Sequence, residues 1–86
     1  MLFHIEQVHA PENCPYGEGG SPSLRDDSVE GVDLKAVHGA FMEHTVYMLV
    51  EANDLEKLNE FLRPGMKVCT TKITPVSPDP LPSWDN

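Results

Sequence analysis

Leu34-Lys-Ala-Val-His-Gly-Ala-Phe-Met-Glu-His-Thr-Val-Tyr-Met-Leu-Val-Glu-Ala52 contains two runs that alternate as strands do, and they meet at Glu43-His44. A two-residue turn at Glu43-His44 predicts a β-hairpin in which Phe41 faces Val46 and Val37 faces Val50. One face of this hairpin is then apolar. The other face is mixed and carries His38, Ala40, Met42, Thr45, Tyr47 and Leu49.

Upstream of the hairpin, residues 2 to 9 also have the two-residue period of a strand. Phe3, Ile5 and Gln7 point to one side, and the opposite side carries Leu2, His4, Glu6 and Val8. Prolines and glycines are dense between Ala10 and Pro22, which predicts a loop. Ser21-Pro22 can open a helix, but apolar residues are scarce after it, so a first helix should be short, frayed or absent.

Downstream, residues 53 to 62 give the clearest helix signal. Asn53 can cap it with Glu56 three residues later, and one stripe is apolar: Leu55, Leu58, Phe61 and Leu62. Pro64-Gly65 should end this helix. Residues 66 to 76 are rich in β-branched side chains and predict the last strand.

The predicted order is strand, weak helix or loop, strand, strand, helix, strand. It is the order of an α+β domain of the ferredoxin-like kind, with a four-stranded antiparallel sheet and a degenerate first helix. We expect one domain over residues 1–76 and a proline-rich tail over 77–86. Trp84 in this tail either docks on a hydrophobic seam, the interpretation that we favour, or lies in solvent. One sheet face would lack a covering layer, so we expect a second copy to cover it in a homodimer.

Charge and hydropathy limit the classes of binding partner that this chain can have. Fourteen acidic and six basic residues give a formal net charge of -8, which disfavours nucleic acid and anionic lipid surfaces. The apolar run from Val46 to Val50 is far shorter than the roughly 20 residues of a membrane helix. The N-terminal residues do not have the pattern of a signal peptide. We therefore expect a cytoplasmic protein with reduced Cys14 and Cys69.

Four short segments resemble a group of small, largely uncharacterised bacterial and archaeal proteins of the dimeric α+β-barrel superfamily. They are His9-Ala-Pro-Glu-Asn-Cys-Pro15, Glu43-His44-Thr45-Val46-Tyr47, Glu51-Ala52-Asn53-Asp54-Leu55-Glu56 and Ile73-Thr74-Pro75-Val76. The resemblance implies the fold and a dimer. It does not select an activity, because the superfamily includes cofactor-free monooxygenases, lactone isomerases, haem-handling proteins and nickel binders.

Several histidine, glutamate and cysteine residues are candidates for a metal or catalytic site. Strand parity places His4 and Glu6 on the open sheet face with His38 and Tyr47. His9 and Cys14 bracket a proline-rich turn that can fold over the strand end, although His9 has the parity of the opposite face. Imidazole, carboxylate and thiolate suit zinc, nickel, copper or iron. The predicted ligands are His4, Glu6, His9, Cys14 and His38, with Tyr47 beside them.

Other functions are compatible with the same residues. His4, Glu6 and His38 can act as acid/base groups of a cofactor-free enzyme on a small organic substrate, similar to the superfamily's monooxygenases and isomerases. An acidic loop or the tail can serve a non-enzymatic interaction subunit. A purely structural role places the histidines at an interface or in turns, with Cys14 as a small packing residue. The sequence favours a homodimeric metal-binding protein over the enzyme and the interaction subunit, and it leaves the purely structural role open.

Overall fold

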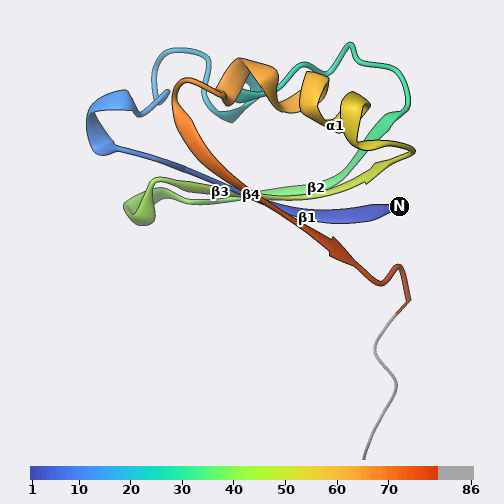
Figure 1. Ribbon diagram of the computed structural model, residues 1–86. Helices are drawn as coiled ribbons and strands as arrows, with labels where there is room; N and C mark the ends of the chain where they lie inside the picture. The colour runs from blue at the N-terminus through green and yellow to red at the C-terminus, as the bar shows by residue number, and fades with distance from the viewer. Residues whose placement is uncertain (80–86) are drawn as a thin grey trace, which may run out of the picture.

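A four-stranded antiparallel sheet and one short α-helix form the fold of residues 1–79, the part of the chain that the computed structural model describes (Figure 1). The strands are β1 (Leu2–His9), β2 (Val32–Ala40), β3 (Thr45–Ala52) and β4 (Cys69–Val76), and the helix is α1 (Leu55–Leu62). Their order across the sheet is β2-β3-β1-β4. The prediction of an α+β fold with a four-stranded antiparallel sheet is confirmed.

One face of the sheet is covered and the other is bare. Figure 1 shows α1 and the loop that follows β1 on the same side of the sheet, while no helix or strand of residues 1–79 lies over the other side. In place of a first helix, the chain between β1 and β2 forms two short 3-10 turns, Pro11–Asn13 and Ser21–Leu24. The expectation of a frayed or absent first helix is therefore confirmed. Among residues 1–79, no helix has both the length and the hydrophobicity needed to cross a bilayer.

Successive side chains of the central strand β1 point alternately to the covered face and to the open face of the sheet. Phe3, Ile5, Gln7 and His9 are buried on the covered side, whereas His4 and Val8 are exposed on the open side. β1 pairs with β3 on one edge and with β4 on the other, so neither edge of it is free to shift. Every odd-numbered side chain from 3 to 9 is consequently fixed beneath the covering layer.

The hairpin register differs from the predicted one. Ala40 pairs with Thr45, His38 with Tyr47 and Val37 with Met48, and residues 41–44 form the loop. The predicted two-residue turn is wrong because Glu43-His44 lacks the residues that primed turns need, and the chain instead makes a 3-10 turn at Phe41–Glu43. The shift is two residues, so residues 36–40 keep their predicted faces. A register shift between Leu34 and Ala36 turns Leu34 toward the core. Phe41 and Met42 leave the strands and are exposed.

Two boundaries near α1 also differ. Asp54, not Asn53, caps the helix, since its Oδ1 accepts a hydrogen bond of 2.8 Å from the Lys57 backbone N–H. After Leu62 the chain continues in a 3-10 turn, Arg63–Gly65. The last strand begins at Cys69, three residues later than the predicted Met66. Residues 80–86, including Trp84, lie outside the described residues.

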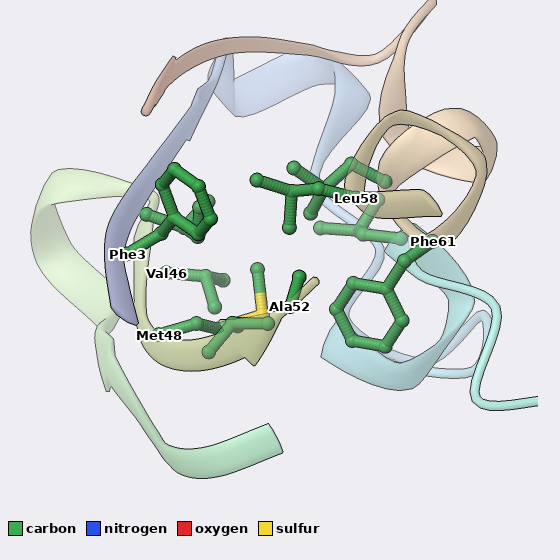
Figure 2. Packing of buried hydrophobic residues seen from close by; sticks show 10 residues of the cluster. Phe3, Val46, Met48, Ala52, Leu58 and Phe61 are labelled. Atoms are coloured by element: carbon green, nitrogen blue, oxygen red, sulfur yellow. The ribbon is translucent and has the colours of Figure 1, made fainter. Parts of the chain in front are cut away.

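The core lies between the sheet and α1, as Figure 2 shows. Phe3, Val46 and Met48 project from the strands toward Leu58 and Phe61 of the helix. All five are buried, and a buried side chain of this size contributes about 1.5–3 kcal/mol relative to an exposed one. The apolar stripe of α1 therefore holds the covering layer on the sheet.

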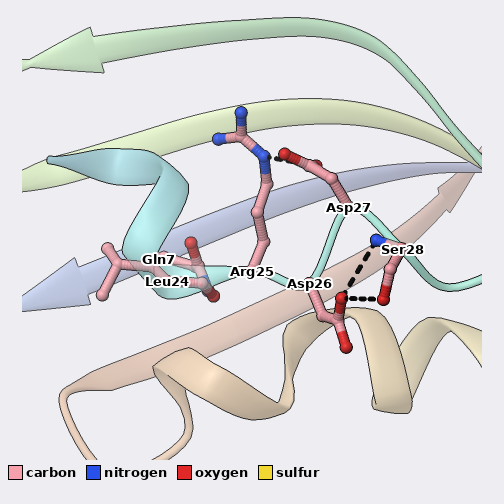
Figure 3. Close-up of polar contacts among 6 residues, drawn as sticks. All are labelled: Gln7, Leu24, Arg25, Asp26, Asp27 and Ser28. Atoms are coloured by element: carbon pink, nitrogen blue, oxygen red, sulfur yellow. Dashed lines mark hydrogen bonds and ion pairs between the residues drawn. The ribbon is translucent and has the colours of Figure 1, made fainter. Parts of the chain in front are cut away.

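A closely packed junction attaches the loop layer, the segment between β1 and β2, to β1. The Gln7 side chain is buried, and its Nε2 donates a hydrogen bond of 3.3 Å to the Leu24 carbonyl (Figure 3). The backbone N–H of Asp26 donates to the Phe61 carbonyl at 2.8 Å, which joins the same loop to α1. A Cβ at Gly65 would lie 2.8 Å from both Gln7 Nε2 and the Leu24 carbonyl oxygen. Only glycine leaves room for the three segments to meet there.

We predict that Gly65→Ala destabilises the protein by about 1–3 kcal/mol, because the added methyl group forces backbone or Gln7 to move in a packed region. Chemical denaturation measures the difference. Gly39→Ala is the matched control, since its Cβ would meet only ordinary contacts of 3.8 Å or more with Phe41. Equal stabilities of the two variants would show that this junction is not tightly packed.

Candidate metal centre

Three potential metal ligands converge at one end of the sheet: His9, Cys14 and His44. The donor atoms of these side chains all lie within 4.8 Å of one another. Donors around one tetrahedral zinc ion lie about 3.3–3.6 Å apart, given bond lengths of about 2.0 Å to nitrogen and 2.3 Å to sulfur. An ion that binds all three side chains would hold their donor atoms at this closer spacing.

Local structure explains how His9 and Cys14 approach each other. His9 is the last residue of β1, and strand parity turns its side chain to the covered face, where it is 7 % exposed. The 3-10 turn Pro11–Asn13 then reverses the chain, with the Cys14 N–H donating to the Pro11 carbonyl at 3.2 Å. The proline-rich segment therefore folds back over the end of the strand and places Cys14 beside His9.

His44 reaches the group from the hairpin loop. Its backbone is left-handed, with φ 50°, a conformation that side-chain-bearing residues adopt infrequently. Its carbonyl accepts a hydrogen bond of 3.0 Å from the His9 N–H, and its own N–H donates to the Phe41 carbonyl at 3.2 Å. The two imidazole rings meet edge to face, with centroids 5.3 Å apart. The four-residue loop thus fixes His44 against His9.

The buried imidazole nitrogens have no hydrogen-bond partner within residues 1–79. This holds for Nδ1 and Nε2 of His9 and for Nδ1 of His44. A buried polar atom without a partner costs about 1–3 kcal/mol, so such atoms in native proteins usually indicate a bound ion, a water or a functional role. A metal ion among the three side chains would use one nitrogen of each imidazole as a ligand.

The protonation state of His9 suits metal binding. Burial lowers the pKa of His9 below its ordinary value of 6.5, and the nearby positive charge that His44 can carry lowers it further. The ring is therefore neutral near pH 7, and neutral imidazole is the form that binds a metal.

The second cysteine stands outside the group. Cys69 pairs with His9 across β1 and β4, and burial raises the pKa of its thiol. The two cysteines are free thiols, and only Cys14 joins the two histidines.

A cavity of about 190 Å³ adjoins the three ligands, all of which form part of its wall. Most of the remaining wall is apolar and includes Pro15, Val37 and Val46. A metal held by three protein ligands on a cavity wall keeps a fourth position for water or another ligand, which is the arrangement of reactive rather than purely structural zinc sites.

The predicted residues divide between the two faces. His9 and Cys14 lie in the cluster, on the covered face, and not on the open face where the sequence placed the site. On the open face, Glu6 and His38 both pair with Tyr47 across the strands, and the His4 and Tyr47 rings have centroids 6.0 Å apart. These four residues therefore share the open face, as the sequence predicted. The role of His4, Glu6 and His38 as ligands, and of Tyr47 beside them, stays a prediction.

The sequence assigned His44 to a turn and missed it as a candidate ligand. The available signal was its position at the hairpin loop, next to the strand that pairs with β1. Only the observed register, with Val8 opposite Thr45, brings residue 44 level with residue 9. Comparisons with protein-family models, curated proteins and solved structures found no match for this chain.

In protein freed of metal with a chelator, we predict that stability falls as the pH drops below about 6.5, toward the lower pKa of folded His9. The unfolded chain takes up a proton at His9 in that range, and the folded chain resists it. Thermal unfolding between about pH 7.5 and 5 measures the slope, which His9→Gln should reduce and His38→Gln should retain. A slope unchanged in His9→Gln would contradict the assigned cause.

Proposed function

We propose that this chain is a small metal-binding protein that holds one transition-metal ion with His9, Cys14 and His44. The observation that carries the proposal is the convergence of three donor atoms within 4.8 Å, two of them on imidazoles with buried nitrogens that lack partners in the described chain. Two imidazoles and one thiolate suit zinc and copper, and they also bind cobalt as a spectroscopic substitute.

We predict that the purified protein, produced without a histidine tag, binds one Co²⁺ per chain with a thiolate-to-metal charge-transfer band. Cys14→Ser should abolish the band, because oxygen replaces the thiolate. His44→Asn should weaken binding by at least about tenfold while keeping the left-handed backbone, which asparagine tolerates. Absorption titration measures both effects.

Matched controls separate this site from the open-face group. His4→Ala and His38→Ala remove exposed imidazoles, and Cys69→Ser removes the cysteine that lies outside the cluster. All three should keep the band and the affinity. If His4→Ala or His38→Ala abolishes binding and His44→Asn does not, the ion belongs to the open face instead.

We further propose that the fold is ferredoxin-like and that the protein is a homodimer joined through its open sheet faces. The antiparallel order β2-β3-β1-β4 supports the first part. The bare face supports the second, because it exposes Val8 and leaves Tyr47 and Leu49 half-buried with no covering layer within residues 1–79. A second copy would bury these side chains.

We predict that Leu49→Lys converts the dimer to a folded monomer at micromolar concentration, because a lysine on this face would bury its charge in the interface. Sedimentation velocity measures the mass, and circular dichroism checks the fold. Leu55→Lys is the control, since Leu55 is exposed on α1, on the other side of the sheet. A monomeric unmodified protein would contradict the proposed dimer.

A further inference from the structure

The cavity beside His9, Cys14 and His44 has a mainly apolar wall. Its wall contains no Asp, Glu, Lys or Arg, so apart from the imidazoles and the Cys14 thiol it offers no charged group to a ligand. Thr45 also lines the cavity, and its hydroxyl donates a hydrogen bond of 2.9 Å to the Glu43 carbonyl. The body of any ligand in this cavity therefore meets mainly apolar surface.

The size of the cavity limits the ligand. A dry cavity of about 150 Å³ is sufficient for benzene. The cavity here, at about 190 Å³, has room for one ring and a short head group. Phe41, with 81 % of its surface exposed, lies on the rim, and Val37 of β2 forms part of the wall.

Charge balance selects the head group. A divalent ion bound by two neutral imidazoles and one thiolate carries a net charge of +1, which is costly beside an apolar wall. One monoanionic head group at the open position would bring the net charge to zero. A thiolate fits best, because an ion that binds Cys14 sulfur accepts a second soft ligand readily.

We propose that the metal centre and its cavity form a binding site for a small organic thiol with an uncharged, apolar body about the size of a benzene ring. The thiol loses its proton to solvent and its sulfur replaces water at the fourth position of the metal, while the body fills the space beside Val37 and Val46. Because the sulfur binds the ion held by His9, Cys14 and His44, this site depends on the proposed function.

The test uses the full chain loaded with Co²⁺ and three probes: phenylmethanethiol, phenylmethanol and 2-mercaptoethanesulfonate. Phenylmethanethiol should add a second thiolate charge-transfer contribution that saturates at one molecule per chain. Phenylmethanol has the same body with a hard hydroxyl head, and 2-mercaptoethanesulfonate has the same head with a charged body. Each should bind at least about tenfold more weakly, since each loses one of the two interactions.

Variants test the cavity itself. Val37→Phe and Val37→Trp fill the space and should weaken phenylmethanethiol binding by about tenfold or more, with the Cys14 band of the cobalt protein unchanged. Leu55→Trp, at an exposed position on α1 outside the cavity wall, should leave binding unaltered. If neither substituted Val37 protein folds, the comparison of the three probes on the unmodified chain still decides the proposal.

The outcomes separate the two proposals. A cobalt protein that shows the Cys14 band but does not respond to phenylmethanethiol would overturn the thiol site and leave the metal site standing. If 2-mercaptoethanesulfonate binds as tightly as phenylmethanethiol, the apolar cavity does not select the ligand, and the proposed preference for an apolar body is overturned. A chain that binds no cobalt would overturn the thiol site together with the proposed function.

Discussion

The burial of His9 at the end of β1 is the constraint on which the candidate site depends. β1 is paired on both edges, so its two-residue period cannot slip, and Phe3, Ile5 and Gln7 commit residue 9 to the covered face. An imidazole placed there loses water and finds no partner among the described residues. Cys14 and His44 come from the two neighbouring loops and lie where one ion can join all three side chains.

The fold and the site are built by the same segments. The loop after β1 carries Cys14 and then runs on to Leu24, whose carbonyl meets Gln7 beside Gly65. That junction holds the loop layer against the sheet two residues before His9. A chain with so weak a first helix therefore fixes its loop by specific contacts, and a metal ion at His9, Cys14 and His44 would add a cross-link between this loop and the hairpin.

Much of the fold could be predicted from the sequence because the signals are local. Strand alternation gave the faces of β1, and the apolar stripe of α1 gave the helix with its correct end at Leu62. The hairpin loop could not be predicted from residue types alone, since Glu43-His44 favours no standard two-residue turn. The position of His44 level with His9 depends on the register between β1 and β3, in which Val8 pairs with Thr45. The sequence did not fix that register, so it indicated two of the three clustered side chains and left His44 in a turn.

The central claim is that one ion is bound by His9, Cys14 and His44 together. X-ray absorption spectroscopy of the zinc-loaded full chain tests it most directly. The account predicts a first coordination shell with one sulfur at about 2.3 Å and two imidazole nitrogens at about 2.0–2.1 Å, with one further light atom. A first shell of nitrogen and oxygen without sulfur would contradict it, because it would place the ion away from Cys14.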